Sequence, residues 1–231
     1  MAPDPQLRLD IGNGRLHDGH GRIFDPAARR WNKTALAAWG EPVSPRRALL
    51  WLQRDSGMPL RAPVAVIGTR TPTPAQVAAA VALGRLLAEH KVTVLCGGRA
   101  GVMEEVCRGV AEAGGLSIGL LPDDEPEAAN PYVTVPLATG IGVARNALIA
   151  RAACCLVAIG GGYGTLSEIA FALQFKRPVF LMEGAPAVDG ARACADAEAA
   201  LDAVARVILA LYGTGPKSGI HFSDKSDAIT M

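Results

Sequence analysis

The chain of 231 residues has few features that would place it in a membrane, in a secretory compartment or around a metal ion. No stretch approaches the roughly 18 uninterrupted apolar residues of a membrane span, and we expect no membrane contact. Its start shows no basic segment followed by an apolar run, which argues against a secretory signal and predicts a cytoplasmic location. The five cysteines include no C-x-x-C spacing, so we expect neither a disulfide framework nor a bound metal.

Neither sign of charge dominates, with 23 basic and 22 acidic side chains. The basic excess that typifies nucleic-acid-binding domains is missing, which argues against a nucleic-acid partner. Half of the residues are hydrophobic and 26 are glycine. The chain can therefore bury a substantial core, and intrinsic disorder is excluded.

Composition changes near residues 59–63, which indicates two parts of different structure. All three tryptophans precede this point, and short apolar runs alternating with alanine-rich stretches follow it. We therefore expect an N-terminal extension over residues 1–62 and a main domain over residues 63–213. A polar tail rich in glycine and serine, residues 214–231, is expected to be loose.

Turn and helix signals fill the N-terminal extension. Two dipeptides that end in glycine, at residues 13–14 and 18–19, interrupt short alternating runs and supply the positive φ angles of tight turns. One or two β-hairpins are expected there. A short helix should follow, because Ser44 can cap it, Pro45 suits its first position and Gly57 ends it.

In the main domain, apolar runs alternate with helical stretches. Nearly continuous apolar runs are typical of strands buried on both faces of a parallel sheet. The alternation predicts the α/β class, with a parallel sheet flanked by helices and a small N-terminal extension of hairpins and a helix. The strands are predicted at residues 64–68, 92–96, 117–121, 132–136, 154–159 and 178–182. The helices are predicted at residues 73–90, 101–113, 143–153, 165–175 and 192–212.

Three glycine-bearing turns, at residues 68–71, 97–101 and 160–165, directly follow predicted strands. Because parallel strands end at one edge of a sheet, these turns should meet there, next to helix N-termini that bind anions. Glycine lets backbone N–H groups approach phosphate oxygens closely, whereas the alternative is that each glycine only makes a tight turn. The residues expected to bind a phosphate-bearing ligand are Gly68, Gly97, Gly98, Arg99, Gly101, Gly160, Gly161, Gly162, Gly164 and Thr165.

Two stretches of the main domain carry a family resemblance. The stretch CGGRAGVMEEVC and the later stretch ARNALIARAACCLVAIGGGYGTLSEIA resemble the LOG family of Rossmann-like proteins, also described as "possible lysine decarboxylases". The family pattern GGxxGxM matches residues 97–103, and the later arginine and GGxGTxxE elements match Arg145 and residues 161–168. The resemblance spans residues 63–212. It implies a Rossmann-like fold, a nucleoside 5′-monophosphate phosphoribohydrolase activity and a homodimer.

Two positions depart from the family pattern. Asn146 stands where the pattern has a lysine after Arg145, and Gly160 stands where it has a proline. In this respect the chain looks closer to a branch that is similar to molybdenum-cofactor carrier proteins. Two functions therefore stay open. One is hydrolysis of the N-glycosidic bond of a nucleoside monophosphate, and the other is non-catalytic binding or carriage of a nucleotide or a phosphate-bearing pterin.

Glu168 and Arg145 are the candidate catalytic residues. Glu168 is expected three residues into a helix that opens on Thr165, where the helix dipole would favour its ionised form. A carboxylate there can hold ribose hydroxyls or stabilise the oxocarbenium character that develops as the N-glycosidic bond breaks. Arg145 offers a forked donor to phosphate or to the leaving base. The alternatives are a helix-capping role for Glu168 and a plain surface position for Arg145, which has no acidic neighbour in sequence.

The scarcity of lysine tests the decarboxylase description. Enzymes of that kind need a lysine that forms a Schiff base with pyridoxal phosphate. No lysine of this chain belongs to a predicted glycine turn at the sheet edge, so we reject the description and expect no cofactor. The lysines are Lys33, Lys91, Lys176, Lys217 and Lys225.

Overall fold

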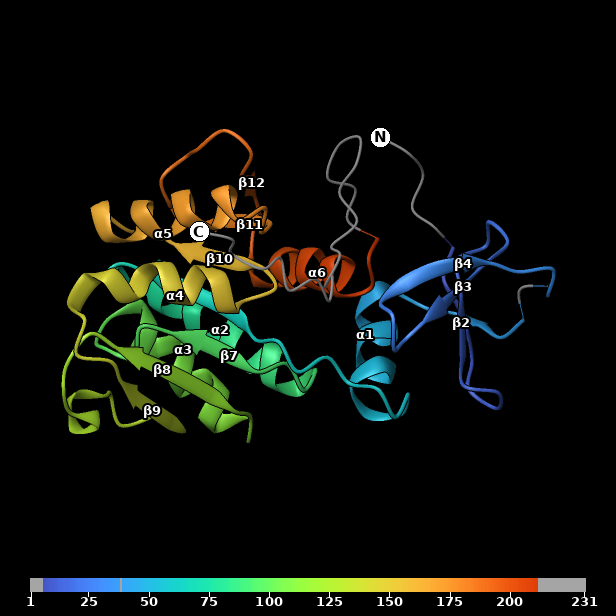
Figure 1. The fold of residues 1–231 in the computed structure, drawn as a ribbon, viewed down its shortest axis with the longest axis horizontal. Helices are drawn as coiled ribbons and strands as arrows, with labels where there is room; N and C mark the ends of the chain where they lie inside the picture. Colours follow the sequence, from blue (N-terminus) through green and yellow to red (C-terminus); the bar gives the residue numbers. More distant parts are fainter. Residues whose placement is uncertain (1–5, 38, 212–231) are drawn as a thin grey trace, which may run out of the picture.

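The structure is a computed structural model that describes residues 6–37 and 39–211 (Figure 1). Its main part is a seven-stranded sheet in the order β12-β11-β10-β6-β7-β8-β9, in which every neighbouring pair of strands is parallel. The predicted α/β class with a Rossmann-like parallel sheet is confirmed. The strands are β6 (Val64–Gly68), β7 (Val94–Cys96), β8 (Ser117–Leu121), β9 (Val135–Ala138), β10 (Leu156–Ile159), β11 (Val179–Met182) and β12 (Arg192–Ala193).

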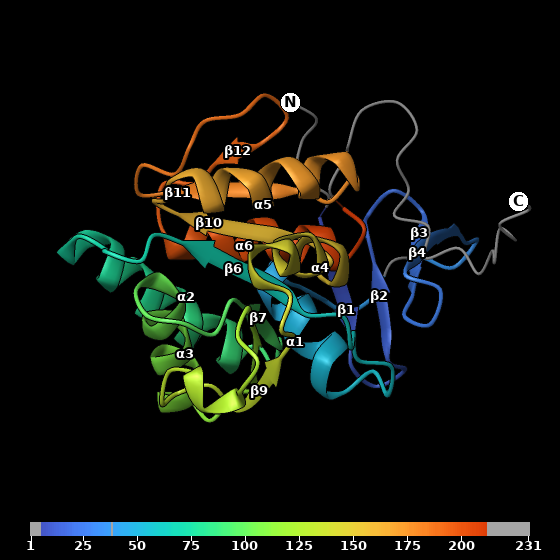
Figure 2. The ribbon, with the colours of Figure 1, turned by 60° about the vertical axis from the view of Figure 1, so that its left-hand side comes forward.

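Helices cover both faces of this sheet (Figure 2). Successive strand residues point to opposite sides. Val64 and Val66 therefore join the core under α2, α3 and α6, whereas Ala65 and Ile67 join the core under α4 and α5. No helix in the described ranges is long and apolar enough to cross a membrane. The helices are α2 (Pro74–Glu89), α3 (Val102–Glu112), α4 (Arg145–Ala152), α5 (Tyr163–Gln174) and α6 (Ala197–Ile208), with 3-10 turns η1 (Pro126–Ala128) and η2 (Gly142–Ala144).

The strand order places a crevice between β6 and β10. The chain starts the sheet at β6, builds outward through β7, β8 and β9, and then returns to place β10 on the other side of β6. In open α/β sheets, ligands bind beyond the carboxyl ends of the strands at the point where this order reverses. Ile159 pairs with Gly68 in the β10–β6 register, so the turns after these strands start side by side.

Helix α5 starts earlier than predicted. It begins at Tyr163 with Gly162 as its N-cap, and not at Thr165. No side chain in the described part of the chain caps it, and the conformational freedom of consecutive glycines removes the sequence signal for the helix start. As a result, Glu168 lies in the second turn of α5, where the helix dipole has little effect.

Several further boundaries differ from the prediction, and among the starts those of β9 and of the last helix differ most. Strand β9 starts at Val135 rather than Tyr132, because the N–H of Tyr132 donates to the side chain of Asn130 and this stretch forms a turn. The last helix starts at Ala197 rather than Arg192, because the residues of β12 first pair with β11.

The N-terminal extension contains more strands than the one or two hairpins expected. It forms a five-stranded antiparallel sheet in the order β4-β3-β2-β1-β5. Gly14 and Gly19 have the positive φ angles predicted for their turns. The strands are β1 (Arg8–Asp10), β2 (Arg15–His17), β3 (Arg22–Asp25), β4 (Arg30–Lys33) and β5 (Glu41–Pro42).

Helix α1 (Pro45–Arg54) lies between this small sheet and the main domain (Figure 1). Leu52 of α1 and Leu201 of α6 belong to one buried cluster, and the two helices are in contact. Trp31 of β4 donates from Nε1 to the carbonyl of Leu209 at 2.7 Å. We therefore propose that residues 1–62 extend the main domain rather than form an independent unit. The tail predicted over residues 214–231 lies outside the described residues.

Candidate functional site

A cavity of about 410 Å³ lies at the crevice between β6 and β10. The turns after these strands form part of its wall, and α4 and α5 supply charged and polar side chains. A volume in this range suits a small-molecule ligand. Within residues 6–37 and 39–211, no group of three His, Cys, Asp or Glu side chains is placed to hold a metal ion. The cavity is lined by Gly68, Thr69, Arg70, Met103, Pro122, Val143, Arg145, Asn146, Gly162, Gly164, Thr165 and Glu168.

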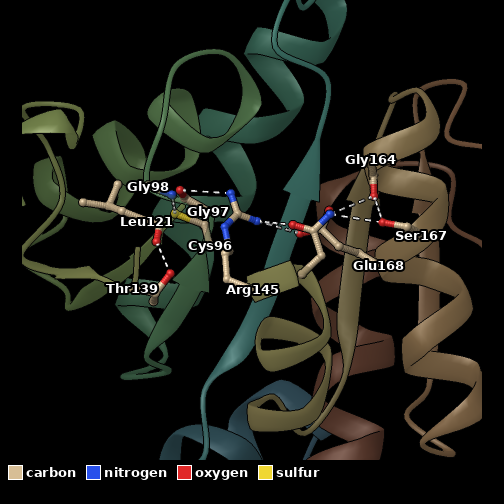
Figure 3. A network of polar contacts seen from close by, with 10 residues as sticks. Cys96, Gly97, Gly98, Leu121, Thr139, Arg145, Gly164, Ser167 and Glu168 are labelled. Carbon is tan, nitrogen blue, oxygen red and sulfur yellow. Dashed lines mark hydrogen bonds and ion pairs between the residues drawn. The ribbon is translucent and has the colours of Figure 1, made fainter. Parts of the chain in front are cut away.

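Arg145 and Glu168 form a buried ion pair inside this cavity (Figure 3). Arg145 is the first residue of α4, and its Nη1 lies 3.3 Å from Oε1 of Glu168 on α5. The two side chains are only 7% and 8% exposed. The alternative of a plain surface arginine is therefore wrong, because folding supplies the acidic neighbour that the sequence around Arg145 lacks.

Two further protein groups bind the Nη atoms of Arg145. Nη1 donates to Oδ1 of Asn146 at 2.5 Å, and Nη2 donates to the carbonyl of Gly97 at 3.3 Å. The Nε atom is buried and has no hydrogen-bond partner in the described part of the chain. An unpaired buried donor costs free energy.

Gly97 makes room for the arginine at the end of β7. A Cβ atom at this position would lie 2.4 Å from Nη2 of Arg145 and 2.6 Å from Sδ of Met103. Contacts this short require the ends of both side chains to shift. A larger residue would therefore push the guanidinium away from the strand end and from Glu168.

Burial raises the pKa of the Glu168 carboxyl to about 7, although the positive charge of Arg145 opposes this shift. The expectation that the helix dipole favours the ionised form is wrong, because loss of hydration dominates at this buried position. The helix-capping alternative is also wrong, since the one hydrogen bond of this carboxylate among the described residues comes from Arg145. Near neutral pH the group can both accept and donate a proton.

Asn146 connects the ion pair to the start of α5. Its Oδ1 accepts from Arg145, and its Nδ2 donates to Oγ of Ser167 at 3.1 Å and to the carbonyl of Gly164 at 3.5 Å. Ser167 donates to the same carbonyl at 2.7 Å. The residue that departs from the LOG pattern therefore orients the arginine and ties α4 to α5.

The residues predicted to bind phosphate fall into two groups. Gly68, Gly162, Gly164 and Thr165 line the cavity. The others are not part of its wall, and they are Gly97, Gly98, Arg99, Gly101, Gly160 and Gly161.

Residues of the second group have other contacts. Arg99 pairs with Asp123, with Nη1 and Oδ2 2.5 Å apart. The carbonyl of Gly98 accepts hydrogen bonds from the backbone and side chain of Asn130. Gly160 donates its N–H to a carbonyl of β11. These contacts shape the turns, which is what the tight-turn alternative describes.

Thr69, Pro122 and Val143 are among the wall residues that were not predicted from the sequence. Thr69 directly follows β6 and Pro122 directly follows β8. A position just beyond a parallel strand is a signal that could have found both. Val143 lies in η2 before Arg145, and no sequence feature distinguishes it.

A family model matches residues 61–208, a range that contains every residue of the cavity wall. The chain belongs to the SLOG cluster4 family. This membership agrees with the resemblance to the LOG family. The match leaves out most of the N-terminal extension.

Two solved structures are similar over nearly their whole length. The molybdenum cofactor binding protein from Rippkaea orientalis is 31% identical with a TM-score of 0.61, covering 64% of this chain and 99% of that one. The Moco carrier protein from Chlamydomonas reinhardtii is 34% identical with a TM-score of 0.58, covering 64% and 98%.

A curated relative from Oryza sativa subsp. japonica carries a different name. It is called "Probable cytokinin riboside 5'-monophosphate phosphoribohydrolase LOGL9" and is 38% identical over 94 residues. The match covers 39% of this chain and 41% of the rice protein. This chain thus matches less than half the length of that relative.

Proposed function

We propose that the cavity of this SLOG protein binds a small molecule carrying a phosphate, with nucleoside monophosphates as the first candidates. The N-terminus of α5 supports this, because the first N–H groups of a helix lack intrahelical partners and bind anions. Gly162, Gly164 and Thr165 of that segment line the cavity, and the exposed Arg70 adds a positive charge to its wall. The names of the relatives refer to a riboside 5′-monophosphate and to the molybdenum cofactor.

We further propose hydrolysis of the N-glycosidic bond, and the observation that carries it is the Glu168 carboxyl in the cavity wall with a pKa of about 7. Deprotonated Glu168 accepts a proton from a water molecule whose oxygen forms a bond to C1′ of the ribose. The bond between C1′ and the base nitrogen breaks, its electron pair leaves with the base, and the base takes up the proton. Arg145 positions the carboxylate, because both of its Nη atoms already bind protein groups.

The second candidate function is carriage of a nucleotide or a phosphate-bearing pterin without turnover. Two observations favour it. The solved relatives that this chain covers almost completely are named for the molybdenum cofactor. In addition, Asn146 occupies the position of the family lysine, and its side chain hydrogen-bonds to Arg145 and Ser167.

The proposals are separated by two measurements. AMP should raise the melting temperature more than adenosine does, because a ligand that binds the folded state stabilises it by mass action. Equal shifts, or no shift, would contradict the phosphate site. The rate of adenine release from AMP, measured by chromatography, should then fall by about 10²-fold or more in Glu168→Gln. Stabilisation by AMP, GMP, CMP and UMP without release of any base would favour carriage over hydrolysis.

A homodimer is proposed from the family resemblance. The small residues of α2 and α3 pack these helices on each other, since a Cβ on Gly84 would lie 2.2 Å from the carbonyl oxygen of Val106. Exposed apolar side chains remain beside the cavity at Val143, Leu148 and Tyr163. Light scattering at micromolar concentration should give twice the chain mass of 23.9 kDa, and a monomeric mass would contradict the dimer. The cytoplasmic location stays a prediction.

A further inference from the structure

A second cavity, of about 440 Å³, lies in the N-terminal sheet. That sheet lies at the end of the molecule away from α4 and α5 (Figure 1), and the second cavity shares no wall residue with the first. Its wall lies entirely before residue 61, where the family match begins. The SLOG fold therefore does not account for it.

The floor of this second cavity is the polar face of β1 and β2. In their register Asp10 lies opposite Arg15 and Arg8 opposite His17, so these four side chains share one face of the sheet. The residues between them, including Leu9, point to the other face and are buried in the core. Asp10, Arg15 and His17 line the cavity.

The polar groups left over on this face are hydrogen-bond donors. Both carboxylate oxygens of Asp10 already accept hydrogen bonds from Asn13. His17 is 2% exposed, and apart from the nearby charge of Asp10 it has no polar partner in the described ranges. Arg15 is exposed at the cavity wall, and apart from the nearby charge of Asp10 it too has no partner in the described ranges. An imidazole and a guanidinium that lack acceptors suit a carboxylate or a phosphate.

Apolar side chains border the same cavity. Leu36 and Trp39 line it while remaining 50% and 71% exposed. Gly40 holds this border close to the sheet, because it has a φ of +101° and a Cβ there would lie 2.2 Å from the carbonyl oxygen of Leu9. An indole face beside a cavity is a surface on which a flat ring stacks.

We propose that this second cavity is a binding site for a small molecule that combines a planar ring with an anionic group. The ring packs on Trp39 and Leu36, and the anionic group accepts hydrogen bonds from His17 and Arg15. The site is separate from the phosphate site proposed above and does not depend on it.

The test follows the indole N–H signal of Trp39 by NMR, assigned with Trp39→Phe, during titration with three probes. Benzoate and phenyl phosphate carry the ring and an anion, and benzamide is the neutral match for benzoate. We expect either anion to shift the signal at millimolar concentration, with at least about tenfold weaker binding of benzamide. If only one of the two anions shifts the Trp39 signal, that anion shows whether the site takes a carboxylate or a phosphate.

Variants decide whether the donors carry the binding. Arg15→Gln should weaken binding of the anionic probe by about tenfold, while Arg47→Gln, an exposed arginine on α1, should leave it unchanged. His17→Gln is a second variant, used if its spectrum otherwise matches the parent. The proposal fails if neither anion moves the Trp39 signal, if benzamide binds as well as benzoate, or if Arg15→Gln binds like the parent.

Discussion

Arg145 and Glu168 lie 3.3 Å apart between Nη1 and Oε1, although 23 residues separate them in the chain. The pair joins the first residue of α4 to the second turn of α5 inside a cavity. A carboxylate in such a place loses its hydration, and the arginine restores only part of that loss. This balance explains why the carboxyl titrates near neutral pH and not in the usual range of glutamate.

The first prediction concerns stability against pH. Glu168 has a pKa of about 7 in the folded state, against 4.5 as its ordinary value. Its contribution to the free energy of unfolding is therefore complete below about pH 4.5 and is lost as the pH rises through about 7. Relative to Glu168→Gln, the parent should lose roughly 3 kcal/mol across this window.

Urea unfolding of both proteins at a series of pH values measures this difference. The exposed Glu89, changed to Gln, is the matched control and should track the parent at every pH. A difference between parent and Glu168→Gln that does not change with pH would mean that folding leaves the pKa of this carboxyl unchanged.

The second prediction concerns Asn146. Changing Asn146 to Ala removes one of the acceptors of the buried Arg145 guanidinium and the donor to Ser167, so one buried N–H of Arg145 loses its partner. We expect a loss of about 1–3 kcal/mol in the free energy of unfolding, together with weaker stabilisation by AMP. Asn32→Ala is the control, because its side chain makes only a 3.5 Å hydrogen bond to Asp25. Equal stability losses in the two variants would contradict a special role for Asn146.

Much of the fold follows from the sequence because its signals are local. Strands β6 and β8 occupy exactly the predicted residues, since short apolar runs bounded by turns identify buried strands. The start of α5 was mispredicted because Gly162 leaves no capping side chain to recognise. The ionisation of the Glu168 carboxyl was mispredicted for a different reason. Its burial depends on α4, which reaches α5 only in the folded chain, and no local pattern reports such packing.

The third prediction concerns Gly97. Changing Gly97 to Ala places a methyl group 2.4 Å from Nη2 of Arg145, so the guanidinium must move away from Glu168. Such overpacking costs about 1–3 kcal/mol of stability, and base release should fall with it if hydrolysis takes place. Gly164→Ala is the control, because no described residue lies within 4 Å of its added Cβ and alanine suits a helix better than glycine. A thermal melt in which both variants match the parent would contradict the close approach at Gly97.

The fourth prediction tests whether the N-terminal extension and the main domain unfold together. Trp31 donates from Nε1 to the carbonyl of Leu209 at the end of α6, and its ring lies 5.2 Å from that of Phe24. Changing Trp31 to Phe removes the hydrogen bond and should lower the free energy of unfolding by about 1 kcal/mol or more. Trp39→Phe, at an exposed indole, should change it by less than about 0.5 kcal/mol. Because one buried cluster runs through both parts, tryptophan fluorescence and circular dichroism should report a single shared transition in urea. Two separate transitions would show that residues 1–62 fold independently of the SLOG domain.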